Sequence, residues 1–296
     1  MTNFENLPQE LKDLIMDHIS QIQSKSERIR VLSSIALVSR RFRYWAHKRL
    51  FATVVFRGRY DTILATVFHR LSQLKDLINA DPQSEMTGIA SHIRSFTLRL
   101  GGRSSLVLPQ LAEGDALPFI FRKIFRNSNG PCSLALILFV PVNGDRLDWM
   151  TLGHDFRCAL LDVVRSARLS TLLLLGIGNL PDDILMCSAV DHISFRNITI
   201  QHYTQSDCGE VPSYSEPRGQ SYHDCIQPYS IETDHSFPIA HILDLTPARS
   251  QPWHFIFQRL RKLTIKINVS DDFTKSAELL KSATSIEDLE IKLNCN

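Results

Sequence analysis

The chain has 296 residues, of which 44% are hydrophobic, and its 33 basic side chains nearly balance 31 acidic ones, for a formal net charge of +2. This composition is typical of a globular protein with one to three domains; it favours neither a nucleic acid nor a membrane as partner, and no apolar run is long enough to cross a bilayer. Six cysteines are scattered without a C-x-x-C pair, which predicts reduced thiols and a cytoplasmic or nuclear location.

The stretch 7–51 opens with a pattern that predicts an amphipathic helix. Its apolar side chains recur at spacings of three and four residues, as one helix face requires. They are Leu7, Leu11, Leu14, Ile15, Ile19 and Ile22. Pro8 suits the first helical position, where its missing N–H would have no intrahelical partner, and Glu10 suits the positive end of the helix dipole. This start also lacks the basic and then apolar pattern of a signal peptide.

A polar spacer at 21–28 separates this helix from two more. The second helix is expected to begin after Ser24 or Ser26 and the third after Ser39, because a serine hydroxyl can accept a hydrogen bond from the first helical turn. Their predicted buried residues are Ile29, Leu32, Ile35 and Ala36, then Phe42, Trp45, Ala46 and Leu50. A bundle of about 45 residues buries too little surface to be stable alone, so it is expected to pack against the following domain or a partner.

Several short motifs follow one another through these helices. They are Leu7-Pro8-x-Glu10, Ile15 with Ile19, Leu37-Val38-Ser39-Arg40-Arg41-Phe42, Trp45, and Leu50-Phe51. In order and distance they resemble an F-box, most closely that of fungal proteins, over residues 1–52, although the polar spacer is longer than in a minimal box. The resemblance implies docking on the Skp-type adaptor of a cullin–RING ubiquitin ligase. The implied contact residues are Leu7, Pro8, Ile15, Leu37 and Val38.

Two other interpretations of the stretch stay open, a helical cap on the following domain and a helix-turn-helix. The second would use the run of basic residues within 40–49, which has no acid between them and could face phosphates. The interleaved Phe42, Trp45 and Ala46 instead indicate that the basic side chains are the solvated face of a helix. We therefore expect no nucleic acid partner.

From residue 91 a short apolar pattern, L-x-x-L-x-L, recurs along the chain. The copies are Ile93-x-x-Phe96-x-Leu98, Leu169-x-x-Leu172-x-Leu174, Val190-x-x-Ile193-x-Phe195, Leu260-x-x-Leu263-x-Ile265 and Ile286-x-x-Leu289-x-Ile291. Alternating apolar residues over such short stretches predict strands, and 133–140 is a further strand that is apolar on both sides.

Helical stretches at 119–125, 156–167 and 273–283 lie between these strands. Strands that alternate with helices predict an α/β fold with parallel strands and crossover helices. The strand pattern resembles a leucine-rich repeat, and Asn268 and Asn294 stand where that family has an asparagine. We therefore expect a three-helix F-box followed by an irregular leucine-rich-repeat-like solenoid over 91–296. A generic α/β domain with a parallel sheet is the alternative.

Two segments interrupt this organisation. Residues 53–90 predict a linker region with a helix, since the apolar residues from Ile63 to Ile78 recur at helical spacing. Residues 201–252 hold six prolines and many polar side chains, so we expect a long loop insert there.

The residue types that catalysis or metal binding needs are present, but not in a suitable arrangement. The 176–179 segment has two glycines after a predicted strand but lacks the third glycine and the acid of a dinucleotide site, so it predicts a turn. His, Asp and Cys at 223–225 are neighbours on a loop and would point apart. The cysteines and histidines of 202–225 do not form the tight pairs of a zinc finger. We expect no enzyme activity, metal or cofactor.

These patterns predict the substrate-recognition subunit of a Skp–cullin–F-box ubiquitin ligase. The alternatives are an F-box protein that works with the adaptor outside a ligase and an enzyme within the C-terminal α/β domain. Residues between the apolar positions of each strand should face away from the repeat core, and the middle of that face is apolar. We expect an unknown target protein to bind there, with the 201–252 insert partly shielding the site; the insert alone or a second layer of helices are the alternative covers. The predicted contact residues are Leu173, Leu175, Arg99, Lys266 and Lys292.

Overall fold

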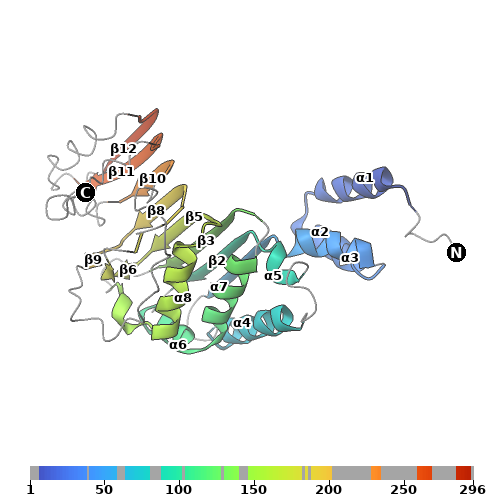
Figure 1. Cartoon of the computed structure of the whole chain (residues 1–296), viewed down its shortest axis with the longest axis horizontal. Helices are drawn as coiled ribbons and strands as arrows, with labels where there is room; N and C mark the ends of the chain where they lie inside the picture. The colour runs from blue at the N-terminus through green and yellow to red at the C-terminus, as the bar shows by residue number, and fades with distance from the viewer. Residues whose placement is uncertain are drawn as a thin grey trace, which may run out of the picture.

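A computed structural model describes residues 7–38, 40–58, 64–80, 88–101, 104–127, 130–139, 146–181, 184–185, 188–201, 228–234, 259–268 and 285–294. N-terminal helices precede an α/β domain whose eight-stranded sheet is entirely parallel. The helical unit, residues 9–50, lies beside the edge of the sheet where the first strands are found (Figure 1).

The helical unit comprises α1 (Gln9–Ser20), α2 (Lys25–Ile35) and α3 (Arg40–Leu50). As predicted, α2 begins after Ser24, whose hydroxyl accepts a hydrogen bond from the N–H of Glu27 at 3.4 Å. Pro8 lies one position earlier than predicted. It is the N-cap residue of α1, with an extended ψ of 148°. Ser39, the predicted cap of the third helix, lies outside the described residues.

The helices of this unit enclose a small apolar core. Its fully buried members are Met16, Ile19, Leu32, Ala36 and Ala46. The predicted buried face was wrong at Leu11, Leu14 and Ile29, which are 46%, 66% and 45% exposed. A bundle this small encloses one narrow stripe of each helix, and in α1 that stripe runs through Met16 and Ile19. The excluded apolar side chains remain at the surface.

The sheet adds its strands in chain order, β1-β2-β3-β5-β8-β10-β11-β12, and each neighbouring pair is parallel. The strands are β1 (Thr53–Gly58), β2 (Ser95–Leu100), β3 (Cys132–Leu138), β5 (Leu169–Leu175), β8 (His192–Arg196), β10 (Ser230–Thr233), β11 (Lys262–Asn268) and β12 (Asp288–Asn294). The predicted α/β class with parallel strands and crossover helices is confirmed.

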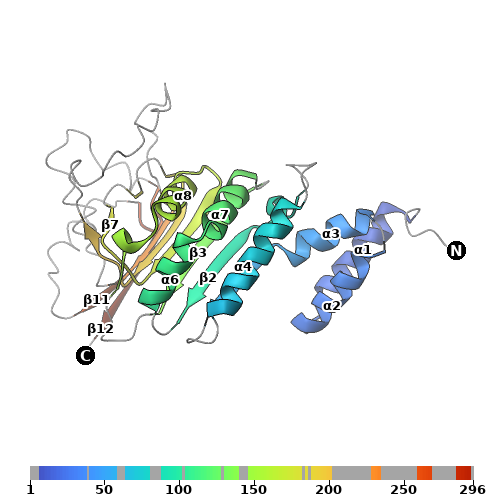
Figure 2. The ribbon, with the colours of Figure 1, turned by 90° about the horizontal axis from the view of Figure 1, so that it is seen from below.

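The helices between the strands form one layer on one face of the sheet. They are α4 (Leu64–Asn79), α5 (Ile89–His92), α6 (Ser104–Glu113), α7 (Ala116–Asn127) and α8 (His154–Val164), with a short 3-10 helix η3 (Trp149–Thr151). α7 packs between α4 and α8, and α6 contacts both α7 and α8 (Figures 1 and 2). α7 and α8 match two predicted helices, and the third, 273–283, lies outside the described residues. Among the described helices, none has both the length and the apolar character that a bilayer crossing requires.

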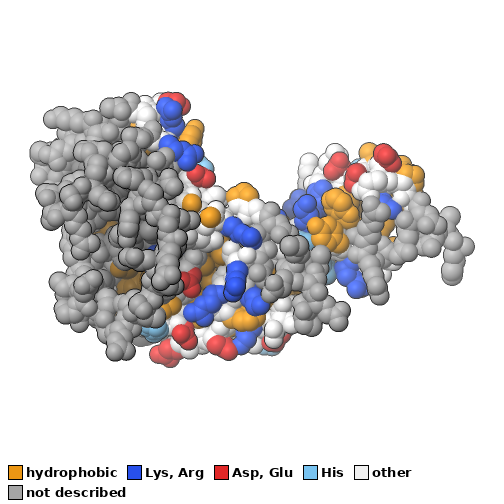
Figure 3. All heavy atoms as spheres, viewed as in Figure 1, with side chains coloured by type: hydrophobic (Ala, Val, Ile, Leu, Met, Phe, Trp, Pro, Cys, Tyr) orange, Lys and Arg blue, Asp and Glu red, His pale blue; other side chains and the backbone are white. Residues whose placement is uncertain are grey.

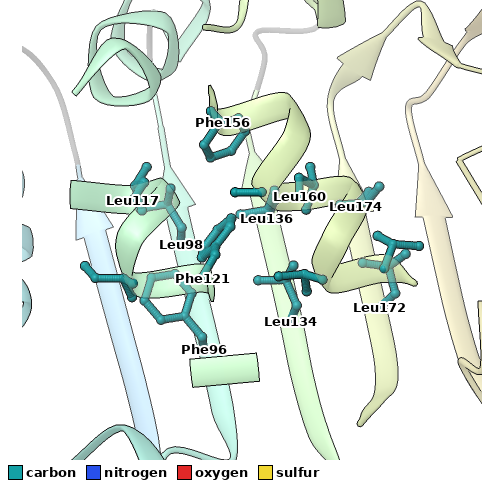
Figure 4. Close-up of a cluster of buried hydrophobic side chains, with 14 of the residues drawn as sticks. Phe96, Leu98, Leu117, Phe121, Leu134, Leu136, Phe156, Leu160, Leu172 and Leu174 are labelled. Carbon is teal, nitrogen blue, oxygen red and sulfur yellow. The ribbon is translucent and has the colours of Figure 1, made fainter. Parts of the chain in front are cut away.

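The main core lies between the sheet and this helix layer (Figure 4). In four of the five L-x-x-L-x-L patterns all three apolar residues are buried, as predicted. Phe121 of α7 is central, with its ring 5.4 Å from that of Phe96 and 5.6 Å from that of Phe156. The fifth pattern differs, because Leu289 and Ile291 belong to β12, an edge strand, and are 44% and 45% exposed.

Two segments predicted as connections contribute strands to the sheet. β1 comes from 53–90, predicted as a helical linker, and α4 of the same region packs on it. β10 comes from 201–252, predicted as a loop insert, and lies between β8 and β11. Each strand is short and adjoins a longer helical or proline-rich stretch that dominates the sequence pattern. The rest of the predicted insert, 202–227 and 235–252, lies outside the described residues.

The backbone turns sharply where β5 and β8 end. Gly176 has a φ of 82° and Asn197 a φ of 49°, and the two residues follow the paired positions Leu175 and Arg196. Short strands come next. β6 (Ile177–Gly178) pairs with β4 (Leu147–Asp148), and β7 (Leu180–Pro181) pairs with β9 (Ile200–Gln201), both in parallel. The segment 176–179, predicted as a turn, bends at Gly176 and Asn179, but Ile177 and Gly178 between them form β6.

A close approach between α6 and the start of α8 gives a first prediction. A Cβ atom on Gly153 would lie 2.8 Å from the carbonyl oxygen of Ala112, whereas one on Gly114 would lie 3.5 Å from that of Leu111. We expect Gly153→Ala to lower the free energy of unfolding by about 1–3 kcal/mol, because backbone must shift to admit the methyl group. The control Gly114→Ala should cost less than about 0.5 kcal/mol. Urea titrations of both variants check this, and equal losses would contradict it.

Candidate functional site

Large apolar side chains are exposed on the helical unit. Leu37 is 80% exposed, Leu14 66%, Val38 50% and Leu11 46%. Pro8, which precedes Leu11 at the start of α1, is also exposed. The start of α1 and the turn between α2 and α3 both lie at the end of the unit that is remote from the sheet (Figures 1 and 2). Hydrophobic surface on this unit is visible in Figure 3. We call Pro8, Leu11, Leu14, Leu37 and Val38 the apolar surface of the helical unit.

The α2–α3 turn that carries Leu37 and Val38 is held by backbone and side-chain hydrogen bonds. The N–H groups of Leu37 and Val38 donate to the carbonyls of Ser34 and Ile35 at 3.1 and 3.0 Å. From α3, the Arg43 Nε donates to the Ala36 carbonyl at 3.1 Å. A turn held in this way presents its apolar side chains in a defined geometry, which lowers the entropy lost when a partner binds.

The predicted adaptor-contact residues have different environments. Leu37 and Val38 are exposed, as a contact role requires, and so is Pro8. Leu7 is half-buried. Ile15 packs against the core of the helical unit, so part of its side chain is used within the unit.

Sequence reasoning missed Leu11 and Leu14 as surface residues by assigning both to the buried face. The signal that identifies them is the width of the apolar face of α1. Leu11, Leu14, Ile15 and Ile19 cover more of the helix than a three-helix unit can bury, so some of these residues must face outward. Met16, on the remaining side, then completes the core.

The basic residues of α3 mostly serve the helical unit itself. The Arg49 side chain donates to Ser20 and lies 3.6 Å from the Asp17 carboxylate of α1. The Lys48 ammonium lies over the Trp45 ring at 5.5 Å. These contacts favour the predicted solvated helix face over a phosphate-binding surface, while the side chains of Arg40 and Arg41 lie outside the described part.

The helical unit meets the sheet domain at α5. His92 is buried there, and its ring lies edge-on to that of Tyr44, with 5.0 Å between the centroids. The Ala52 carbonyl, just after α3, accepts hydrogen bonds from the N–H groups of Arg94 and Ser95, at 2.9 and 3.0 Å. These contacts join α3 to the start of β2.

Acidification should weaken this junction. Burial, followed by the charges of His47, Arg94 and Lys48, lowers the pKa of His92 below its usual 6.5. An unfolded chain therefore binds a proton at this histidine more readily than the folded one, so stability falls as the pH drops through 6.5. We expect the melting temperature to fall between about pH 7.5 and about pH 5.5, and His92→Gln to reduce that fall. Calorimetry at both pH values checks this, and an identical pH dependence in the two proteins would refute it.

The second candidate surface is the face of the sheet opposite the helix layer, which we call the open face. Its side chains alternate with those of the core and are half-buried or exposed, apart from Thr264 of β11, which is buried. The strand pairings align one row of them across the sheet, from Arg57 through Arg99, Ile137 and Leu175 to Arg196. Thr233 of β10 pairs with both Phe195 and Ile265, so Lys266 stands one position further along, as Arg196 does, and Lys292 pairs with Lys266. We call Arg57, Arg99, Ile137, Leu175, Arg196, Lys266 and Lys292 the cross-strand row.

The predicted target-contact residues all lie on the open face. Leu173 and Leu175 of β5 are half-buried. The Arg99 guanidinium lies over the Phe139 ring at 5.6 Å. The Lys266 Nζ lies 4.0 Å from the Oε1 atom of Glu232, and the Lys292 Nζ lies 3.0 Å from the Oε1 atom of Glu290.

The register also adds residues that sequence reasoning missed, namely Arg57, Ile137 and Arg196. Ile137 was hidden in a strand that is apolar on both sides. Arg57 belongs to a strand that was not predicted, and Arg196 follows the last apolar residue of its pattern. Within the cross-strand row these three residues are brought into line with Arg99 and Leu175.

A shallow depression of about 530 Å³ lies at the amino-terminal ends of β3, β5 and β8. Its lining residues are Gly130, Pro131, Ala167, Arg168, Leu169, Ser170, Ala189 and Asp191. Ligands of open parallel sheets bind at the carboxyl ends of the strands, so the position does not favour an active site. Among the residues that the structure describes, no three His, Cys, Asp or Glu side chains cluster as metal ligands would. The 202–225 histidines and cysteines lie outside them.

The chain matches no known family profile, no curated protein and no solved structure. Its function is therefore inferred from the two surfaces and from the sequence motifs that lie on them. The apolar surface of the helical unit includes Pro8, Leu37 and Val38 of the motifs that resemble an F-box, and the open face carries the residues predicted to contact a target.

Proposed function

We propose that the chain is the substrate-recognition subunit of a Skp–cullin–F-box ubiquitin ligase. The helical unit would be an F-box that docks the Skp-type adaptor and, through it, the cullin. The sheet domain would be an irregular leucine-rich-repeat-like solenoid that holds a target protein. The chain itself would catalyse no reaction.

The observation that carries the proposal is the exposure of Leu37 and Val38 on an ordered turn. They belong to one of the motifs that resemble the family, Leu37 to Phe42, and Leu37 is 80% exposed. A soluble protein rarely leaves several large apolar side chains bare on so small a unit, and such clusters mark protein-binding surfaces. Leu11 and Leu14 of α1 are two further exposed apolar side chains on the same unit.

The target-binding half of the proposal is supported by the sheet. Strands stacked in chain order, with helices on one face, are the arrangement of repeat proteins, whose extended open surfaces bind partners. Leu173 and Leu175 stand on that face rather than in the core between sheet and helices. Adaptor and target would be bound by separate parts of one chain. The mechanism is then proximity, because holding both raises the effective concentration of acceptor lysines near the ligase.

Two other functions stay open to direct test. An F-box protein that works with the adaptor outside a ligase would co-purify with the adaptor but not with a cullin. An enzyme within the sheet domain would need convergent titratable groups in a pocket. The depression beside β5 contains Arg168 and Asp191, but it lies at the amino ends of the strands, whereas ligands of open parallel sheets bind at the carboxyl ends. The ligase proposal is therefore preferred to an enzyme.

Adaptor docking is tested by replacing Leu37 and Val38 with aspartate. Charges at the centre of an apolar interface should cost about 2 kcal/mol or more of binding energy, roughly thirtyfold in affinity. Both side chains are at least half exposed, so the fold should be kept. The matched control is Leu77→Asp on α4, where a leucine is 46% exposed.

The measurement is titration calorimetry with a purified Skp-type adaptor, with circular dichroism to verify the fold. Unchanged affinity in a folded L37D/V38D protein would rule out this docking surface. Replacing Leu7 and Pro8 together by alanine should reduce the affinity for the adaptor less than L37D/V38D does, because Leu7 is half-buried.

The target surface is tested by Leu173→Asp with Leu175→Asp. Both side chains face the open side, so we expect a folded protein with a stability loss of about 1–2 kcal/mol, normal adaptor binding and loss of co-purifying targets. The contrasting variant is Leu172→Asp, at a neighbouring residue that is fully buried against the helix layer, which should unfold the domain. Affinity purification with mass spectrometry checks the targets. Should the double variant unfold as Leu172→Asp does, the open face would be core and the solenoid proposal would fail.

A further inference from the structure

The charges on the open face are unevenly compensated. Within β10, β11 and β12, the acidic residues Glu232, Asp288 and Glu290 each have a basic partner. The pairs are Arg196 with Glu232 at 2.5 Å, Lys262 with Asp288 at 2.7 Å and Lys292 with Glu290 at 3.0 Å. On the side of β1 and β2, Arg57 and Arg99 form no ion pair with any residue that the structure describes. Among the described residues, the positive charge of the cross-strand row that has no acidic partner therefore lies at the β1–β2 end.

An apolar patch adjoins these arginines. It consists of Ala135, Ile137 and Phe139 of the β3 segment with Leu173 and Leu175 of β5, all on the open face. Phe139 is 47% exposed, which is unusual for a phenylalanine in a sheet with a large core.

Arg99 connects the charge to this patch. Its guanidinium stacks over the Phe139 ring at 5.6 Å, which holds the charged group beside the apolar side chains while leaving its hydrogen-bond donors available. Aromatic residues and arginine are enriched at protein interfaces relative to the rest of the surface.

We propose that the target is bound through an extended segment that crosses the strands along the cross-strand row. Its apolar side chains cover Ile137 and Leu175, and an acidic flank contacts Arg57 and Arg99. This inference rests on the proposed target-binding role and names the chemistry of the target. The acidic flank points towards the helical unit, because Arg57 lies on the edge strand beside it.

The dimensions of the row set the length of the segment. Neighbouring strands lie about 4.8 Å apart, so the four steps from Arg57 to Arg196 span about 19 Å. An extended chain advances about 3.3 Å per residue, so a segment of about six residues covers that distance. A polynucleotide fits less well, since the middle of the row is aliphatic and Glu232, Glu290 and Asp288 would repel phosphates.

The test is a peptide selection on the full chain. A displayed library of random peptides of about twelve residues is selected for binding, which is about twice the length the row requires. We expect enriched peptides to place Asp or Glu on one side of two apolar residues. Arg57→Glu with Arg99→Glu should weaken their binding roughly tenfold or more at low salt, and raised salt should weaken wild-type binding.

A peptide of reversed charge and a matched control variant test whether binding depends on the charges of Arg57 and Arg99. A synthetic peptide with the acids replaced by lysines should bind the double variant better than the wild type. Arg126→Glu, an exposed arginine at the end of α7 in the helix layer, should leave binding unchanged. Peptides without acidic enrichment, equal binding to the double variant, or displacement of the peptide by a single-stranded oligothymidylate would each overturn the inference.

Adaptor binding is measured on the same proteins so that the two proposals fail separately. Arg57 and Arg99 lie on the sheet, so their replacement should leave adaptor affinity unchanged. If the wild-type chain binds the selected acidic peptides but no adaptor, the ligase proposal fails and the peptide site stands. If the chain binds the adaptor but peptide binding is unchanged when Arg57 and Arg99 are replaced, the ligase proposal stands and the peptide-site inference fails.

Discussion

A chain of aromatic contacts centred on Phe121 holds the domain together. The ring of Phe96 lies 5.6 Å from that of Phe56 and 5.4 Å from that of Phe121, which in turn lies 5.6 Å from that of Phe156. These four residues belong to β1, β2, α7 and α8, so one cluster fixes the helix layer on the first strands. Both candidate surfaces depend on it, because α5, which meets the helical unit, packs against α7.

The strand phases were predictable from sequence because burial leaves a local signature. Three apolar residues in a fixed pattern are needed on the side that meets the helices, and Leu169, Leu172 and Leu174 are each fully buried. β1 and β10 escaped prediction because each adjoins a longer helical or proline-rich stretch whose pattern dominates the local sequence. The sheet recruits them through backbone pairing with neighbours that are distant in sequence.

The candidate sites were also predictable only in part. Leu37 and Val38 could be assigned to a surface because they belong to a motif that resembles a docking motif, and Arg99 could be assigned to the open face because it alternates with buried residues. The cross-strand row was not, since it depends on which residue of one strand stands beside which residue of the next. The connections between the strands are irregular, so the sequence alone does not show which residues of neighbouring strands are paired. Leu11 and Leu14 were misplaced because periodicity shows that a helix has an apolar face, not how much of that face a small unit can cover.

The order of strands in the sheet has a consequence for how such a protein can evolve. Each strand touches the one before and the one after it, so β11 and β12 share no contact with β1, which adjoins the helical unit. Substitutions at well-separated positions combine additively. Selection can therefore alter the far end of the open face, around Lys266, with little epistasis on α3 and α5. The open face could therefore change in a lineage while the helical unit stays under separate, unchanged constraint.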